Sequence, residues 1–249
     1  MDEQQAIDLA RANGNGRAQA PRRVAIVCDG SARWAEQNKL TIAAGHEAAA
    51  DTVLARIADA AALGIQQLTL YAFSTENWGR PASEVSELLS MLARRIERDT
   101  PALDHKSVRV RFIGRRDRAS GSLQAAMQAA ERLTASNSGL QVFVALDYGG
   151  RAEILAAAER YSGGGEEAFA KLLYDPQMHD PDLVIRTSGE QRLSNFLLWQ
   201  TAYAELVFRS ELWPDFDRRA FLQAIAEYGA RRRRFGGRDA TASTTPLGG

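Results

Sequence analysis

Two short stretches, VAIVC at Val24–Cys28 and LTLYAF at Leu68–Phe73, are apolar at nearly every position. This composition is typical of strands in a parallel sheet whose two faces are both covered, because neither side of the strand meets water. Further short runs share this strand character. The six predicted strands are Val24–Cys28, Gln67–Phe73, Val108–Gly114, Leu140–Leu146, Leu183–Arg186 and Glu205–Phe208.

Longer stretches with helical periodicity lie between these strands. They are Ala32–Asn38, Glu47–Ala62, Ser83–Arg98, Ser120–Thr134, Ala152–Tyr161, Glu167–Leu173 and, at the end, Arg218–Arg231. Alternation of strands and helices predicts an α/β fold with a mostly parallel sheet. We therefore expect one domain over residues 23–237, a six-stranded sheet flanked by helices. Residues 1–22 are predicted to be a flexible arm and residues 238–249 a disordered tail.

The overall composition narrows the class of protein. A chain of 249 residues is long enough for one sizeable core. Lys plus Arg and Asp plus Glu number 31 each, and a net charge of zero argues against nucleic-acid binding through bulk charge. The single cysteine, Cys28, excludes an internal disulfide and a multi-cysteine zinc site. No apolar run reaches the roughly 18 residues of a membrane span, and the polar first residues lack the core of a signal peptide. We expect a cytoplasmic protein.

Polar residues follow several of the predicted strands. In an open parallel sheet, ligands bind beyond the carboxyl ends of the strands. The segments at these ends are DGSARW (29–34), STENWGRP (74–81), DYGG (147–150) and RTSGEQRLS (186–194). Together they supply carboxylates, hydroxyls, glycines and arginines, whose planar fork pairs with two phosphate oxygens at once. This combination suits a diphosphate and a divalent cation.

Each of these features also has an ordinary structural explanation. Asp29 and Gly30 are compatible with a turn and a helix cap, Arg186 with a structural ion pair, and His46 with a core or capping histidine. The arginine run 231–234 is typical of a solvated helix end. The tryptophans are better explained as packing anchors than as substrate contacts: Trp34, Trp78, Trp199 and Trp213. The functional interpretation depends on the polar segments lying together at one edge of the sheet.

Common phosphate and hydrolase motifs are absent from the sequence. It contains no GxxxxGK[ST] loop, and no GxGxxG follows the first strand. Neither a metal-binding HExxH nor a nucleophile-elbow GxSxG is present.

A longer set of motifs resembles a known family. The segments are VAIVCDGSARWA, GHEAAADTV, LTLYAFSTENWGRP, DYGGRAEI, PDLVIRTSGEQRLSNFLLWQTAYAELVF, LWPDF and RRRFGG. They closely resemble the undecaprenyl diphosphate synthase family of cis-prenyltransferases, in the family's order from about Arg23 to Gly237. The resemblance implies a Mg²⁺-dependent enzyme, usually a homodimer, that condenses isopentenyl diphosphate with an allylic diphosphate into a Z-polyprenyl diphosphate. The two aspartate-rich DDxxD boxes of the all-helical trans class are not found.

The resemblance also implies roles for individual residues. Asp29 matches the catalytic aspartate that handles Mg²⁺ and the allylic diphosphate, and Glu205 matches a second metal-linked carboxylate. Ser31 and Asn77 are the further candidate catalytic residues. Candidate substrate-binding residues are Gly30, Arg33, Trp34, His46, Phe73, Ser74, Glu76, Trp78, Arg80, Arg186, Arg192, Ser194, Arg234 and Gly236. The last two belong to an RxG element that commonly reaches the active site across the dimer.

Two helices carry apolar stripes that have two interpretations. In Ser83–Arg98 the stripe consists of Val85, Leu88, Leu89, Leu92 and Ile96, and the helix after His46 offers Val53, Leu54 and Ile57. Such stripes are ordinary core in most proteins, whereas the resemblance implies that part of them lines a product tunnel. The arginines 94, 95 and 98 either limit the depth of this tunnel or point to solvent.

The sequence departs from the family pattern at several positions near the implied site. Ser31 replaces the usual asparagine, Ala32 and Ala49 replace glycines, and Ile42 replaces an arginine that contacts the allylic diphosphate. The lost contact is worth about 1.5–3 kcal/mol. These departures favour, as an alternative to polyprenyl synthesis, a short-chain or irregular prenyl diphosphate synthase. A non-catalytic partner subunit is a third hypothesis, which the presence of Asp29 disfavours. We also expect peripheral membrane contact through the product.

Overall fold

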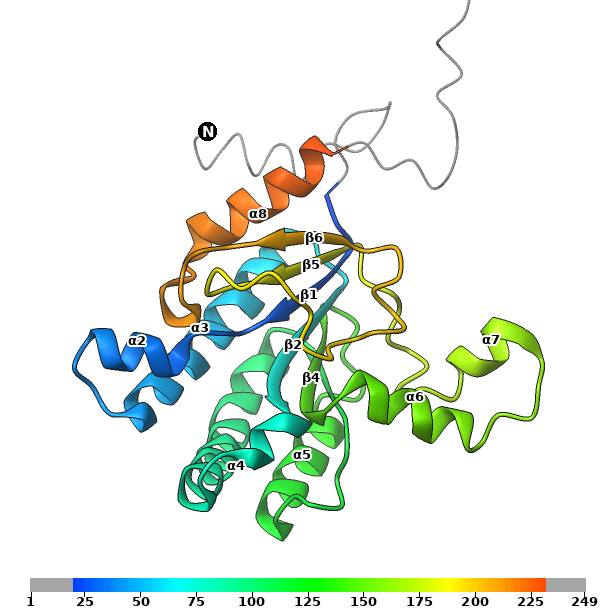
Figure 1. Cartoon of the computed structure of the whole chain (residues 1–249), viewed down its shortest axis with the longest axis horizontal. Coiled ribbons are helices and arrows are strands. Elements are labelled where there is room, and N and C mark those ends of the chain that lie inside the picture. The colour runs from blue at the N-terminus through cyan, green and yellow to red at the C-terminus, as the bar shows by residue number, and fades with distance from the viewer. Residues whose placement is uncertain (1–19, 232–249) are drawn as a thin grey trace, which may run out of the picture.

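The computed structural model describes residues 20–231, which form one six-stranded sheet in which every pairing is parallel (Figure 1). The strands are β1 Arg23–Val27, β2 Gln67–Ser74, β3 Arg109–Ile113, β4 Gln141–Tyr148, β5 Leu183–Arg186 and β6 Glu205–Phe208. Their order across the sheet is β3-β4-β2-β1-β5-β6. The predicted fold class is therefore confirmed, and all six predicted strands lie within two residues of the observed ones.

The helices follow the predicted alternation. They are α2 Ser31–Gln37, α3 Ile42–Ala62, α4 Ala82–His105, α5 Gly121–Leu133, α6 Gly150–Ala158, α7 Gly165–Ala170 and α8 Arg218–Ala230. Two short 3-10 helices, η1 Thr75–Gly79 and η2 Trp213–Asp215, were not predicted. Helix α4 continues through Pro101, seven residues past its predicted end at Arg98. Proline inside a helix removes only one backbone donor, and the remaining turns of α4 are long enough to compensate.

The two faces of the sheet are covered in different ways. Val24 and Ile26 point into a core shared with helices α3, α4, α5 and α8, whereas the alternate residues Ala25 and Val27 point into a second core. The second core is completed by residues from the long connections on either side of β5: Met178, Phe196 and Leu197. The expectation that helices cover both faces is thus met on one face, while mainly irregular chain packs on the other.

The order of the strands places a crevice beside β1. The chain leaves β1 toward β2 on one side and later returns to pair β5 on the other side. Ligands bind at such a switch point, beyond the carboxyl ends of the strands. Val27 at the end of β1 lies beside Arg186 at the end of β5. Asp29 therefore leaves the sheet next to the Arg186 side chain.

Some sequence predictions fall outside the described residues. Most of the predicted arm at 1–22 and all of the predicted tail at 238–249 lie there, as do Arg234 and Gly236. Within residues 20–231, no helix has the length and apolar character needed to cross a membrane.

Candidate active site

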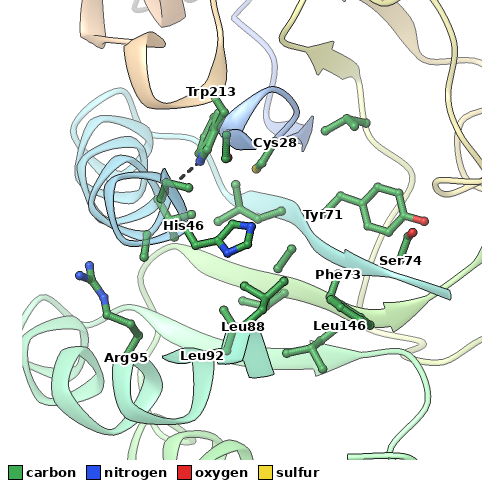
Figure 2. Close-up of a pocket in the computed structure, with 18 of the residues that line it drawn as sticks. Cys28, His46, Tyr71, Phe73, Ser74, Leu88, Leu92, Arg95, Leu146 and Trp213 are labelled. Atoms are coloured by element: carbon green, nitrogen blue, oxygen red, sulfur yellow. Dashed lines mark hydrogen bonds between the residues drawn. The ribbon is translucent and has the colours of Figure 1, made fainter. Parts of the chain in front are cut away.

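A cavity of about 690 Å³ opens at the carboxyl ends of β1, β2 and β5. Its mouth is lined by polar residues that the sequence had singled out: Asp29, Gly30, Ser31, Arg33, His46, Ser74, Glu76, Asn77, Arg80, Arg186 and Ser194. Phe73 lines it too, and the remaining walls are mainly apolar side chains of α3, α4 and the sheet (Figure 2). The cavity thus joins a charged entrance to an apolar interior.

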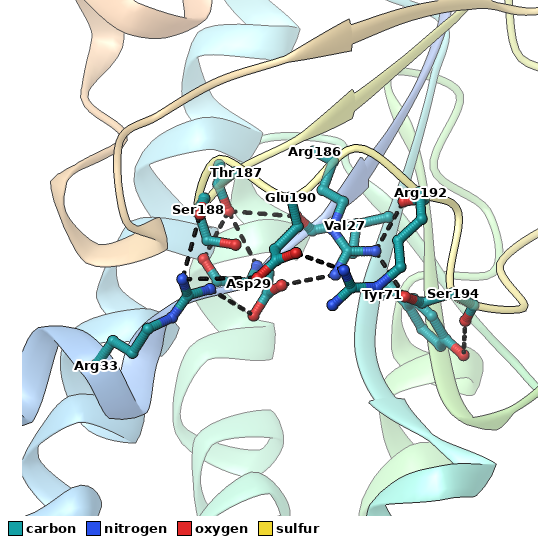
Figure 3. A network of polar contacts seen from close by, with 10 residues as sticks. All are labelled: Val27, Asp29, Arg33, Tyr71, Arg186, Thr187, Ser188, Glu190, Arg192 and Ser194. Carbon is teal, nitrogen blue, oxygen red and sulfur yellow. Dashed lines mark hydrogen bonds and ion pairs between the residues drawn. The ribbon is translucent and has the colours of Figure 1, made fainter.

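The charged entrance is built around one ion pair. Nη2 of Arg186 lies 2.7 Å from Oδ2 of Asp29. The other terminal nitrogen of Arg186 donates to the carbonyl oxygen of Arg192 at 2.7 Å and to Oγ of Ser194 at 2.6 Å (Figure 3). Arg186 is 4% exposed, and these contacts hold its two terminal nitrogens, although its buried Nε has no hydrogen-bond partner. The Asp29 carboxylate remains partly open to the cavity.

The turn that carries Asp29 is held by its backbone. Oγ1 of Thr187 accepts a hydrogen bond from the Asp29 N–H at 2.9 Å and donates one to the Asp29 carbonyl at 2.7 Å. Gly30 follows with a φ of 110°, and a Cβ built there would meet Leu212 Cδ2 at 2.8 Å. Because L-residues with a side chain rarely adopt this φ, glycine is needed at this position. Gly30 is therefore required by the shape of the turn that presents the Asp29 carboxylate to the cavity.

A second arginine reaches the same carboxylate from helix α2. Nη2 of Arg33 lies 3.7 Å from Oδ1 of Asp29, and its Nη1 donates to the carbonyl of Ser188 at 3.3 Å. Glu190 lies 3.9 Å from Arg33 and also pairs with Arg192. Three guanidinium groups and two carboxylates are gathered here, which leaves an excess of positive charge suited to phosphate oxygens.

The segment after β2 forms the opposite side of the entrance. Asn77 accepts a hydrogen bond from the Ser74 N–H at 2.9 Å in a capping box that begins the 3-10 helix η1. Oε1 of Glu76 accepts from the Asn195 side chain at 2.8 Å. Burial opposes ionisation of Glu76, but this bond and neighbouring ones outweigh it, so that its pKa is lowered. The η1 segment is thus tied to the loop after β5.

Trp78 supports η1 from outside the cavity. Its Nε1 donates to Oδ1 of Asp147 at 2.8 Å, and the Arg118 guanidinium lies 4.8 Å from the centre of its ring. Arg118 also pairs with the buried Asp147 carboxylate. The tryptophan therefore fixes the position of the segment, as a packing anchor does, and does not line the cavity.

His46 stands at the mouth on helix α3. Burial and the nearby positive charge of Arg80 lower its pKa, although Glu84 acts in the opposite direction. A neutral imidazole at the mouth can accept or donate a hydrogen bond.

The structure does not bring every predicted residue to this cavity. Trp34 is bound instead to Asp215, at 2.7 Å through its Nε1, and Arg192 contributes its backbone carbonyl while its side chain pairs with Glu190. Glu205 is the first residue of β6, at the amino end of the sheet, and pairs with Arg231 at 2.9 Å. Within this chain Glu205 is therefore separated from Asp29, because the two carboxylates lie at opposite ends of parallel strands.

The sequence of this region decides the family. Residues 27–236 match the family described as "Putative undecaprenyl diphosphate synthase". The chain belongs to this family. The prediction of a prenyltransferase is thereby confirmed.

Curated relatives and a solved structure agree with this membership. The chain is 44% identical over 231 residues to an isoprenyl transferase of Rhizobium meliloti, covering 88% of this chain and 94% of the relative. It is 45% identical over 227 residues to a ditrans,polycis-undecaprenyl-diphosphate synthase of Shewanella oneidensis described as (2E,6E)-farnesyl-diphosphate specific, covering 87% and 82%. Lavandulyl diphosphate synthase from Lavandula x intermedia, solved with dimethylallyl diphosphate, is similar in structure, with a TM-score of 0.84 and 34% identity over 87% of this chain and 98% of that one.

Three residues in or beside the cavity were not among the predicted site residues. Thr187 and Asn195 both stand in the loop after β5 and make the contacts described above. A hydroxyl directly after a buried strand was the available signal for Thr187, and Asn195 follows the predicted Ser194. Tyr71, inside β2, donates to the Tyr148 carbonyl at 3.1 Å; its position within an apolar run gave no signal.

The donor set at the entrance fits the magnesium ion that the family implies. Mg²⁺ is usually held by one or two carboxylates together with waters and substrate phosphates. Asp29 offers one carboxylate to the cavity, and residues 20–231 contain no group of three or more His, Cys, Asp and Glu side chains that could hold a metal. The site therefore fits an ion that is shared with a bound phosphate.

Proposed function

We propose that this family member joins isopentenyl diphosphate to an allylic diphosphate, releases diphosphate and one proton from the isopentenyl unit, and forms a Z-configured prenyl diphosphate. The observation that carries the proposal is the single cavity with two kinds of wall. A diphosphate ester of an isoprenoid has a strongly charged head and an apolar tail, and the cavity offers arginines at its mouth and aliphatic side chains behind them.

The arginines act on the charged head of the substrates. Breaking the allylic carbon–oxygen bond leaves negative charge on the departing diphosphate, and fixed cations stabilise that charge as it develops. Arg33 is partly exposed beside Asp29, whereas Arg186 is held rigidly by Asp29 and Ser194. Asp29 would hold the Mg²⁺ ion, which would supply further neutralisation of the leaving group.

The remaining entrance residues position the two reactants. The alkene of isopentenyl diphosphate must approach the allylic carbon, and holding both molecules in one cavity removes much of the entropic barrier. The η1 segment with Ser74, Glu76 and Asn77 faces the loop that carries Ser194 across the mouth. Two diphosphates held by these two sides would place their tails in the same apolar interior.

A matched pair of variants tests the proposal. Asp29→Asn keeps the shape of the side chain but removes its charge, and we expect it to abolish incorporation of labelled isopentenyl diphosphate. Asp117→Asn is the control, because this carboxylate pairs with Arg115 and does not line the cavity. Circular dichroism establishes that both variants are folded. Full condensation activity in folded Asp29→Asn would overturn the proposal.

A short-chain product is the second candidate, because the sequence departs from the family pattern at position 42. Ile42, where the family usually has an arginine, is 45% exposed at the start of α3 and does not line the cavity. Sizing the products made from several allylic primers separates short chains from polyprenyl chains.

We also propose that the enzyme works as a homodimer. Leu155 on α6 and Tyr203 before β6 are 65% and 76% exposed, so both side chains are available for contact with a second copy of the chain. Helices α6 and α7 extend to one side of the sheet (Figure 1). Light scattering tests the proposal: a dimer mass is expected, and a monomer mass at assay concentration would contradict it. The cytoplasmic location and membrane contact through the product stay predictions from the sequence.

A further inference from the structure

Helix α4 presents one unexpected residue to the apolar interior of the cavity. Its lining residues recur every three or four positions, as expected for one face of a helix. They are Leu88, Met91, Leu92, Arg95, Ile96, Asp99, Thr100 and Leu103. The face is apolar up to Leu92, and Arg95 is the first charge on it. At 1.5 Å per residue, Arg95 stands about 20 Å along the axis from the start of α4 at Ala82.

The guanidinium group of Arg95 is surrounded by carboxylates. It lies 2.7 Å from Asp51 and 3.3 Å from Glu47, both on helix α3, and 2.9 Å from Asp99 on α4. Its side chain is only 8% exposed. Figure 2 shows Arg95 at the edge of the cavity, between α3 and α4. The ion pairs therefore join the two helices at the first charge on this face, and Ile96 and Leu103 line the cavity beyond it.

The neighbouring arginines behave differently. Arg94 is exposed, and the side chain of Arg98 is 60% exposed while it pairs with Asp99 from outside. The sequence left open whether these arginines limit the depth of a tunnel or point to solvent. Arg95 faces the cavity, whereas Arg94 and Arg98 face solvent. Only Arg95 among the three lines the cavity.

We propose that Arg95, held by Asp51, Glu47 and Asp99, is a polar wall within the cavity that limits the length of the isoprenoid product. The proposal rests on the proposed function, because it assigns a task to the interior of the same cavity. A hydrocarbon chain that grows to Arg95 must either displace the guanidinium from its carboxylates or bury it further. The hydrocarbon offers no hydrogen-bond acceptor in return. Both are unfavourable for a buried charge. Elongation stops when the chain reaches this wall.

The decisive variant is Arg95→Leu, which removes the charge and leaves an apolar side chain. It leaves no buried carboxylate without a partner, since Asp51 is largely exposed, Glu47 is about half exposed and Asp99 keeps Arg98 at 2.7 Å. We expect products longer than those of the wild type by at least one isoprene unit, from the same allylic primer and labelled isopentenyl diphosphate. Arg94→Leu, on the exposed face of the same helix, is the matched control and should leave product length unchanged.

A second variant keeps the proposal testable if Arg95→Leu does not fold. Asp51→Ala removes a mostly exposed carboxylate that holds the guanidinium, so it should fold and shift the distribution in the same direction by a smaller amount. Product lengths identical to the wild type in both variants would refute the role of Arg95 in limiting product length and would leave the proposed condensation activity untouched. No condensation by the wild-type protein with any primer would instead refute the proposed function.

Discussion

Replacing Arg186 with lysine keeps a positive charge at the end of β5 but removes the planar fork that joins three groups. In the wild type, one terminal nitrogen of Arg186 contacts Asp29 at 2.7 Å, while the other contacts Ser194 at 2.6 Å and the Arg192 carbonyl at 2.7 Å. A lysine has one ammonium group on a flexible stem. It can retain one side of this arrangement but not both sides together.

The structure sets the size of the expected effect. A hydrogen bond to a charged group contributes about 1.5–3 kcal/mol. The conservative assumption is that Arg186→Lys loses one such contact in the transition state. At about 1.4 kcal/mol per tenfold change, kcat/KM for isopentenyl diphosphate should fall by about 10- to 150-fold. Lysine keeps the net charge of this position, so a purely electrostatic role for Arg186 would give a much smaller loss.

Steady-state incorporation of labelled isopentenyl diphosphate at a saturating allylic primer measures this loss. Arg116→Lys serves as the control, because Arg116 pairs with Glu131 between β3 and α5 and does not line the cavity. A folded Arg186→Lys enzyme whose kcat/KM is within twofold of the wild type would refute the argument from geometry.

Three further substitutions test other parts of the structure. Asp59→Ala leaves the buried Arg56 without its carboxylate at 2.6 Å and should lower the free energy of unfolding by about 3–5 kcal/mol in denaturant titrations; an unchanged midpoint would count against it. Burial and Arg80 lower the pKa of His46 below its ordinary value of 6.5, so the unfolded chain binds a proton first as the pH falls, and the folded state loses stability. His46→Gln should therefore lose less stability than the wild type between about pH 7.5 and about pH 5.5, and equal losses would contradict this. Ile42→Arg should lower KM for the allylic substrate by about tenfold or more, and an unchanged or higher KM would argue against a missing phosphate contact.

Much of the site could be predicted because parallel strands impose simple rules. The carboxyl ends of neighbouring strands meet at one edge, so Asp29 after β1 and Arg186 at the end of β5 had to be close. The same rule explains the separation of Glu205, which begins its strand instead of ending it. The assignment of Glu205 beside Asp29 came from the resemblance alone, without regard to this direction.

Other features depend on how elements pack, which the sequence does not encode locally. The inward position of Arg95 depends on the approach of α3 to α4, since its partners Asp51 and Glu47 lie on another helix. Helical periodicity places Arg95 nearer to the apolar stripe than Arg94 or Arg98, but it does not show that carboxylates of α3 hold the Arg95 guanidinium. The partner of Trp34 was equally hidden, as Asp215 is distant along the chain.

The pairing of β1 with β5 has a consequence for synthesis of the protein on the ribosome. Val24 pairs with Leu183, and the backbone carbonyl of Asp29 also accepts a hydrogen bond from the Trp213 N–H at 3.0 Å. One edge of β1 therefore stays open until most of the polypeptide has been translated. Open strand edges invite pairing with other chains, so the nascent chain is exposed to aggregation over this interval. Catalytic competence is acquired late, when the last third of the chain closes the sheet.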